Sequence, residues 1–290
     1  MRLTFTTLFC FGLLVSFAQT GTLKESLKVK STILGKEVSY CVYLPAGYDA
    51  TNRRYPVLYL LHGYTDNETG WVQFGEAPYI ADKAIAAGEA TPMIIIMPDA
   101  GVSWYINSYD GKVKYEDFFV KELIPHVDAT YRSRPTKEFR AVAGLSMGGH
   151  GSFLMATRHP DLFVACAPLS GAFWTEESVT KTPDDVWARI FADLYGKDLK
   201  GADRFTPHLR SYSGLEIVKD GNADELKKVK YYIDCGDDDF LIEGNMALHL
   251  EMKNKGIPHE FRVRDGAHDW TYWRTALPDV LKFVSQSFHR

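Results

Sequence analysis

Residues 139–149, which read FRAVAGLSMGG, decide how this chain folds. The apolar run at 139–143 is short enough to be a buried strand, and residues 152–157 that follow Gly149 predict a helix. Between them stands the pattern G-x-S-x-G, centred on Ser146. A strand, this pattern and a helix together form a sharp turn that lifts a serine hydroxyl clear of the backbone. Flanking glycines allow the turn, because side chains there would collide with neighbouring strands. The alternative is a glycine-rich turn with an ordinary capping serine, so the rest of the chain must decide.

Length and composition indicate one large α/β domain. The chain has 290 residues, of which 46% are hydrophobic and 24% charged, and its mean hydropathy is -0.20. Without residues 1–18 the basic side chains fall from 33 to 32 and the acidic ones stay at 37, so the formal charge is 32 minus 37, or -5. No basic cluster is present, so we expect neither nucleic acid nor an anionic membrane as a partner.

The first 18 residues predict a secretory signal. Arg2 gives a basic start, an apolar run follows at 5–15, and small residues stand at Ser16 and Ala18. The run is too short for a comfortable membrane span. We therefore expect cleavage after Ala18 and a secreted or periplasmic domain at 19–290, with an uncleaved anchor as the alternative.

Three cysteines remain after such a cleavage, namely Cys41, Cys166 and Cys235. An odd number argues against a disulfide framework. Cys41 and Cys166 lie in apolar strand-like runs, where buried thiols are expected, and the spacing leaves a single disulfide open.

Strand and helix patterns alternate along the chain. Two alternating runs, 27–34 and 38–44, surround Gly35 and predict a hairpin. Further strands are predicted at 56–61, 93–97, 163–167, 229–233 and 259–263, and helices at 77–87, 115–131, 240–253 and from Tyr272 onward. Apolar strands between helices predict a mostly parallel central sheet flanked by helices on both faces. Residues 172–228 interrupt this rhythm and predict a small lid above the carboxyl ends of the strands, with a peripheral decoration as the alternative.

A base and an acid for the serine follow it in the chain. A serine hydroxyl is a weak nucleophile that needs an imidazole to take its proton and a carboxylate to orient the imidazole. Three aspartates at 237–239 follow one predicted strand, and His268 follows the next. Both loops lie at the same edge of the sheet as Ser146, in the chain order Ser, Asp, His. Asp269 is a weak choice for the acid, because adjacent residues rarely present their side chains to each other.

The segment after the strand at 56–61 predicts the site for a developing oxyanion. His62 lies there and could be a rival base, but we expect it to be a structural brace. The oxyanion would then be held by the backbone N–H groups of Tyr64 and Met147. No metal site or cofactor is expected, because the nine histidines are scattered and neither G-x-G-x-x-G after a strand nor a P-loop occurs.

Four segments resemble the feruloyl esterase and acetyl xylan esterase group of carbohydrate esterases, family 1. They read YLLHG at 59–63, GLSMGG at 144–149, DCGDDDFL at 234–241 and HDWTYW at 268–273. This group is related to esterase D and to the mycolyltransferases, and the resemblance runs roughly from Val38 to the C-terminus. It implies an α/β-hydrolase fold with a small lid insertion.

The resemblance also implies roles for individual residues. The group places its acid three residues after the strand-ending glycine, which is Asp239 here, and its base at the histidine of the last segment, His268. Trp71 matches an aromatic residue that follows the oxyanion loop. We expect Trp71, Trp104 and Trp270 to contact the substrate, with packing of the lid onto the domain as the alternative for each.

Taken together, the sequence predicts a secreted serine esterase that forms an acyl-enzyme on Ser146 and needs no cofactor. Hydroxycinnamoyl esters such as feruloyl esters on plant polysaccharides are the preferred substrates. An acetyl xylan esterase, an acyltransferase to sugar hydroxyls and a non-catalytic carbohydrate-binding protein of the same fold are the alternatives. The complete order Ser146, Asp239, His268 argues against the last.

Overall fold

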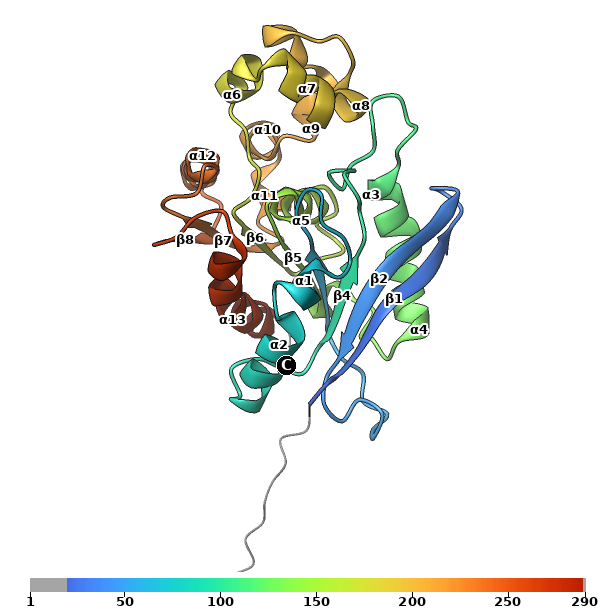
Figure 1. The fold of residues 1–290 in the computed structure, drawn as a ribbon. Coiled ribbons are helices and arrows are strands. Elements are labelled where there is room, and N and C mark those ends of the chain that lie inside the picture. Colours follow the sequence, from blue (N-terminus) through green and yellow to red (C-terminus); the bar gives the residue numbers. More distant parts are fainter. Residues whose placement is uncertain (1–19, 289–290) are drawn as a thin grey trace, which may run out of the picture.

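An eight-stranded, mostly parallel sheet forms the centre of the molecule (Figure 1). The computed structural model describes residues 20–288. The strands are β1 Thr22–Ser31, β2 Lys36–Leu44, β3 Val57–Leu61, β4 Ile94–Pro98, β5 Arg140–Leu145, β6 Ala165–Leu169, β7 Lys230–Gly236 and β8 His259–Arg264. They lie in the order β1-β2-β4-β3-β5-β6-β7-β8. The β1–β2 and β2–β4 pairs are antiparallel and all the others are parallel, which confirms the predicted α/β-hydrolase class.

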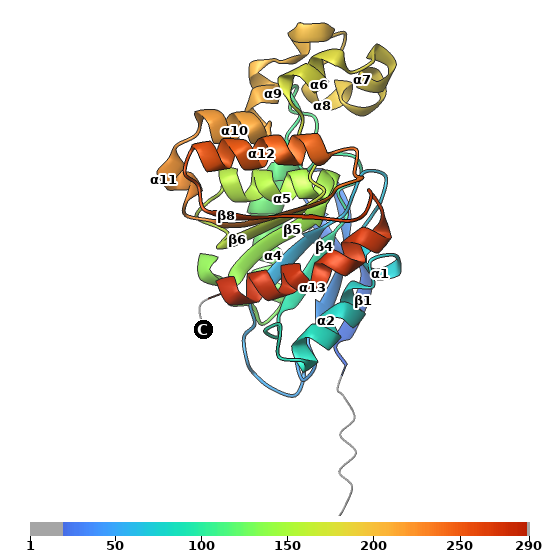
Figure 2. The same ribbon diagram turned by 90° about the vertical axis from the view of Figure 1, so that its left-hand side faces the viewer.

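Helices cover both faces of the sheet, so each face has an apolar core of its own (Figure 2). One face carries α3 Tyr115–Phe118, α4 Ile124–Thr130, α5 Met147–Arg158, α10 Gly214–Asp220 and α12 Ile242–Asn254, and the other carries α2 Ala77–Ala86 and α13 Trp270–Ser287. Alternate residues of a strand enter the two cores. In β3, Tyr59 and Leu61 face the first core while Leu58 and Leu60 face the second. The central strands are buried on both faces, so the positions of their carboxyl ends are fixed by the two cores.

Most predicted elements are present, and the differences have local causes. The helix predicted at 115–131 is divided by a π-helical turn at Phe119–Leu123 between α3 and α4. Pro125 has no N–H to donate, so the regular bonding pattern cannot continue through this point. The strand predicted at 163–167 lies two residues later, as β6. The hairpin is as predicted, with Gly35 at a positive φ of 65° in its turn.

The segment 172–228 between β6 and β7 consists of short helices. They are α6 Glu176–Lys181, α7 Asp184–Ile190, α8 Ala192–Tyr195, α9 Pro207–Ser211, α10 and α11 Ala223–Leu226. The outer helices α6 to α9 stand together at the top of Figure 1, away from the layers around the sheet. The inner helix α10 packs against α5 and α12. The insertion therefore has an outer part and an inner part that belongs to the helical layer.

The three cysteines of the described chain are buried free thiols. Burial raises the pKa of Cys41 to about 11 and that of the Cys166 and Cys235 thiols still further, so all three stay protonated and unreactive at neutral pH. Between residues 20 and 288, no helix is both long and apolar enough to cross a membrane. The signal predicted at 1–18 lies outside the described residues.

Candidate active site

Ser146 stands on a strained turn between β5 and α5. Its φ of 54° and ψ of -116° are unusual for a residue with a side chain. Two glycines make the turn fit: a Cβ on Gly144 would lie 2.5 Å from the Gly148 carbonyl oxygen, and a Cβ on Gly148 would lie 2.4 Å from the Leu61 carbonyl oxygen. The Ser146 amide donates to the Leu169 carbonyl oxygen at 2.9 Å. The serine is thus fixed at the carboxyl end of a buried central strand.

A hydrogen-bonded relay runs from Ser146 to Asp239. The distance from Ser146 Oγ to His268 Nε2 is 2.9 Å, and His268 Nδ1 lies 2.8 Å from Asp239 Oδ2 and 3.0 Å from Oδ1. Because an ionised carboxylate can only accept, Nδ1 donates to it and Nε2 is left to accept the serine proton. The structure thus brings together three residues predicted from sequence, from the loops that follow β5, β7 and β8.

The surroundings of Asp239 favour its charged form. Burial would raise the pKa of this carboxyl, since only 1% of the residue is exposed. Hydrogen bonds from His268, from the Leu241 amide at 2.8 Å and from the Ser170 hydroxyl outweigh that effect and lower the pKa below its usual value. The carboxylate is therefore ionised at neutral pH and can hold the imidazole in one tautomer.

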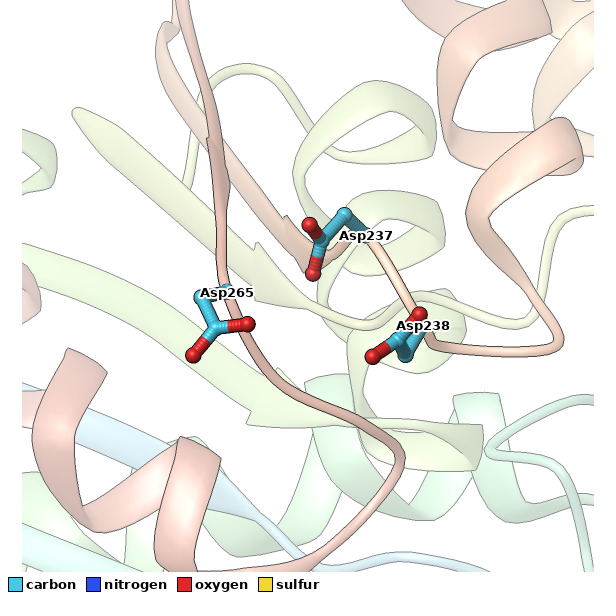
Figure 3. Close-up of side chains that lie close together, drawn as sticks. All are labelled: Asp237, Asp238 and Asp265. Atoms are coloured by element: carbon cyan, nitrogen blue, oxygen red, sulfur yellow. The ribbon is translucent and has the colours of Figure 1, made fainter.

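Asp237 and Asp238 have a different setting from Asp239. Both are exposed and lie beside Asp265 from the loop after β8, with ligand oxygens within 4.8 Å of one another (Figure 3). The Asp237 carboxylate accepts the Gly266 amide at 3.0 Å, and the Asp238 amide donates to the Gly266 carbonyl oxygen at 3.0 Å. These bonds join the loop that carries Asp239 to the loop that carries His268. The contacts of Asp237 and Asp238 therefore indicate a structural role.

The two backbone amides predicted to hold an oxyanion belong to Tyr64 and Met147. Tyr64 follows β3 and Met147 is the first residue of α5, and both Tyr64 and Ser146 line the open space at the site. Among residues 20–288 neither amide has a hydrogen-bond acceptor. The neighbouring strands β3 and β5 are followed in the chain by β4 and β6, which lie on opposite sides of this pair in the sheet. Ligands of α/β sheets bind at such a switch point.

His62 braces the loop that carries Tyr64. Its ring is buried, with 1% of the residue exposed. Its Nε2 accepts the Ala100 amide at 2.9 Å, and its Nδ1 donates to the Gly63 carbonyl oxygen at 2.8 Å. Both ring nitrogens are occupied by the backbone, as expected for a structural brace rather than a second base.

Two cavities meet at Ser146, and Tyr64 and Phe240 line both. The first, here called the insertion-side cavity, has a volume of about 470 Å³ and an apolar lining that includes Trp104, Trp174 and Phe191. The second, here called the loop-side cavity, has a volume of about 450 Å³. Its lining includes His268, Trp270 and Trp273 together with the carboxylates of Asp66 and Asp269.

Aromatic rings make the wall of the insertion-side cavity rigid. The ring centroids of Trp104 and Trp174 lie 4.8 Å apart, and those of Trp174 and Phe191 lie 5.0 Å apart, both edge to face. Trp104 is almost fully buried at a positive φ of 54°. A planar apolar group could pack against this wall without rearranging it.

The three tryptophans predicted to contact substrate have different places. Trp104 lines the insertion-side cavity and Trp270 the loop-side cavity. Trp71 lies in the core with 1% exposure, donates from Nε1 to the Leu61 carbonyl oxygen at 2.9 Å, and packs edge-on against Trp270 at 5.3 Å. Because Trp71 is buried, the prediction that it contacts the substrate is wrong. It packs against Trp270 from the core side instead.

Sequence reasoning missed Phe240 and Ser170. Phe240 is 75% exposed, and its ring centroid lies 4.5 Å from that of His268. The signal was present, since an aromatic residue directly follows Asp239. Ser170 directly follows β6, where its hydroxyl accepts Trp273 Nε1 at 3.1 Å. Its place at the same edge of the sheet as Ser146 could have been inferred from the strand order alone.

A mostly parallel sheet with a serine turn after a central strand defines an α/β-hydrolase. The esterase family model, described as "Putative esterase", matches residues 31–284. A curated relative named "Endo-1,4-beta-xylanase/feruloyl esterase" from Xylanibacter ruminicola is 38% identical over 202 residues, which are 66% of this chain and 28% of the relative. An "Acetyl esterase" from Caldicellulosiruptor saccharolyticus is 25% identical, over 82% of this chain and 86% of the relative. A solved structure named "ferulic acid esterase" is 33% identical, with 93% of this chain and 100% of that chain covered and a TM-score of 0.80.

The chain belongs to this esterase family, whose class is the carboxylic ester hydrolases. The resemblance to the feruloyl esterase group of carbohydrate esterases is thereby confirmed. The chain spans little more than a quarter of the xylanase/feruloyl esterase, at 28% of its length.

Proposed function

We propose that this protein is a serine esterase that releases hydroxycinnamoyl groups, feruloyl above all, from plant polysaccharides. The observation that carries the proposal is a relay of Ser146, His268 and Asp239 that opens onto an aromatic cavity. In the first step Ser146 Oγ attacks the ester carbonyl carbon while its proton passes to His268 Nε2. The amides of Tyr64 and Met147 stabilise the oxyanion.

The second half of the reaction frees the enzyme. His268 returns the proton to the alcohol oxygen as the carbon–oxygen bond breaks, and the alcohol leaves an acyl group on Ser146. Water then attacks this acyl-enzyme, with His268 again taking the proton. His268 returns that proton to Ser146 Oγ as the bond between Oγ and the acyl carbon breaks and the free acid leaves. Asp239 keeps the imidazole oriented throughout and stays ionised because its pKa is lowered. The cycle needs no group beyond those of the chain and water.

The position of His268 supports a separate role for each of the two cavities. The leaving alcohol must lie where His268 Nε2 can protonate it, and His268 lines the loop-side cavity. The acyl group then extends into the insertion-side cavity, against Trp104, Trp174 and Phe191. This apolar space suits a planar aromatic acid better than an acetyl group, which would leave most of about 470 Å³ unfilled.

Two further observations bear on the substrate and the place of action. The names "feruloyl esterase" and "ferulic acid esterase" of two relatives support an aromatic acyl group. The relative named "Acetyl esterase" favours acetyl esters as a second candidate. The pattern of residues 1–18 supports secretion or export to the periplasm.

A substrate panel tests the proposal. Values of kcat/KM would be measured for methyl ferulate, methyl p-coumarate, p-nitrophenyl acetate and acetylated xylan, with Ser146→Ala as the blank. We expect the two hydroxycinnamates to have higher kcat/KM values than the acetyl esters. Rapid deacetylation of xylan with methyl ferulate left intact would instead make the protein an acetyl esterase. Hydrolysis of none of the four would remove the esterase proposal itself.

A further inference from the structure

An aromatic pair lies at the loop-side cavity, with one partly buried ring that lines the cavity and one exposed ring packed beside it. Trp270 lines that cavity. Phe74, which follows helix α1 Gly70–Gln73, is 50% exposed. The two ring centroids lie 5.9 Å apart with 36° between the ring planes. Exposed aromatic side chains beside an active site are costly to solvate and commonly contact a ligand.

Neighbouring side chains and the backbone hold the Phe74–Trp270 pair in place. Trp71 and Trp273 each meet Trp270 edge to face, with ring centroids 5.3 Å away. Gly75 permits this packing, because a Cβ there would lie 2.9 Å from the Trp270 ring. Arg274 on α13 donates to the Phe74 carbonyl oxygen at 2.8 Å and ties the end of α1 to the helix that carries Trp270. The pair is therefore a preformed surface that a ligand need not order.

Two carboxylates give the neighbouring cavity a specific chemistry. Asp66 and Asp269 both line it beside Trp270. One oxygen of Asp66 accepts the Asn67 amide at 2.9 Å, and one oxygen of Asp269 accepts the Tyr272 amide at 2.9 Å. Carboxylate oxygens accept hydrogen bonds from hydroxyl groups, and aromatic faces pack against apolar C–H surfaces. A neutral sugar ring presents both kinds of group, whereas an anionic ligand would be repelled.

We propose that Phe74 and Trp270 form a sugar-binding platform for the saccharide that carries the ester, with Asp66 and Asp269 accepting its hydroxyl protons. This inference rests on the proposed function, because it assigns the alcohol part of the substrate to the loop-side cavity. The ligand of the platform is then a neutral pentose or hexose ring that is joined directly to the ester oxygen. The main-chain sugars of a polysaccharide would follow along Phe74.

Two esters with the same acyl group test the platform. The kcat/KM values for methyl ferulate and for a feruloylated arabino-oligosaccharide would be measured for the wild type, Phe74→Ala and Trp270→Phe. We expect Phe74→Ala to lower the ratio of the saccharide ester value to the methyl ester value by about three- to tenfold, since one aromatic contact is lost. Tyr109→Ala is the matched control, because Tyr109 is 44% exposed and lines neither cavity at Ser146. It should leave both values unchanged.

The outcomes separate the platform from the esterase proposal. An unchanged ratio in both Phe74→Ala and Trp270→Phe, with the wild type hydrolysing methyl ferulate, would overturn the platform alone. A loss confined to methyl ferulate would place the acyl group on the platform and overturn it as well. Binding gives a readout without turnover: an unesterified arabinoxylan oligosaccharide should change the tryptophan fluorescence of Ser146→Ala and should do so less strongly when Phe74→Ala is added. No change in either protein would overturn the platform even if every ester were hydrolysed.

Discussion

The two cavities at Ser146 are built from different parts of the chain. The loop-side cavity is lined by the segments that follow β3, β5, β7 and β8, which are fixed by the sheet and also carry Tyr64, Ser146 and His268. The insertion-side cavity is lined mainly by residues from 172 to 191, together with Trp104. Under the proposed function, bond breaking depends on segments that follow the strands of the sheet, whereas the acyl group is selected mainly by the helical insertion.

Ser146→Ala should abolish turnover of every ester, because both cavities serve the same nucleophile. We expect kcat to fall by about 10⁴-fold or more for methyl ferulate and for p-nitrophenyl acetate alike. A fluorophosphonate probe should label the wild type at Ser146 and leave the variant unlabelled, as peptide mass mapping would show. Label on another serine, or a large loss with one ester only, would contradict a shared nucleophile.

Asp239→Asn should have the next largest effect. The amide would no longer hold His268 in the required tautomer, so kcat should fall by about 10² to 10⁴-fold for both esters. Asp238→Asn is the matched control, because Asp238 is exposed and its backbone, not its carboxylate, bonds Gly266. It should stay within about threefold of the wild type. A severe Asp238→Asn with a mild Asp239→Asn would mean that the acid is assigned one residue too late.

Trp174→Ala should separate the two cavities from each other. Removing this ring from the insertion-side cavity should lower kcat/KM for methyl ferulate by about 10- to 100-fold, as an aromatic contact and its buried area are lost. The same change should alter kcat/KM for p-nitrophenyl acetate by less than about threefold, since an acetyl group does not reach the ring. Equal losses with both esters would mean either that the acyl group binds elsewhere or that the serine turn is distorted. Labelling of the variant with the fluorophosphonate probe, followed by mass spectrometry, would distinguish the two, because a distorted turn should also slow the labelling of Ser146.

The sheet and the relay were predictable because local rules decide them. The apolar strands and the glycines around Ser146 each leave a pattern within a few residues. The chain order of serine, acid and histidine follows from the loops after three predicted strands, and the resemblance to the esterase group singles out Asp239 among three aspartates. Trp71 was predicted to contact substrate from its place after the oxyanion loop, but such a place does not tell whether a tryptophan faces solvent or the core. Its place was decided by the Leu61 carbonyl group, which accepts its indole N–H.

The contacts that fix the insertion to α3 and α5 could not be recognised in the sequence. Glu116 lies in α3, where the sequence shows only two adjacent acidic residues between two aromatic ones. In the fold it is 5% exposed and bonds Arg158 Nε at 2.8 Å, His159 Nε2 at 2.8 Å and the Tyr212 hydroxyl at 2.6 Å. Arg158 also donates to the Ser211 carbonyl oxygen at 2.8 Å. One carboxylate thus joins α3 and the end of α5 to the insertion, through residues far apart in sequence.

Glu116→Gln should weaken the insertion side with little effect on the relay. Burial would raise the pKa of Glu116, but its bonds to His159, Arg158 and Tyr212 lower it from 4.5 to about 2. Because the pKa is lower in the folded state, the carboxylate contributes stability that is complete above pH 4.5 and is lost as the pH falls towards 2. We expect the variant to lose about 2 to 3 kcal/mol of unfolding free energy at pH 7, measured by urea denaturation. Between pH 4.5 and about 2 its unfolding free energy should depend less on pH than that of the wild type.

The same variant can show whether this anchor supports the acyl cavity. Tyr212 and Trp174 line one small space behind the insertion-side cavity, so loosening Tyr212 should raise KM for methyl ferulate by about two- to fivefold and leave p-nitrophenyl acetate nearly unaffected. Glu177→Gln is the matched control, because its carboxylate is 74% exposed and, among residues 20–288, its ion-pair partner is Lys181 on the same helix, α6. It should leave the unfolding free energy at pH 7 and both KM values unchanged. If Glu116→Gln unfolds like the wild type at pH 7 and keeps the same pH dependence, the insertion is held by its apolar contacts with α5 and α12, and the carboxylate adds nothing to them.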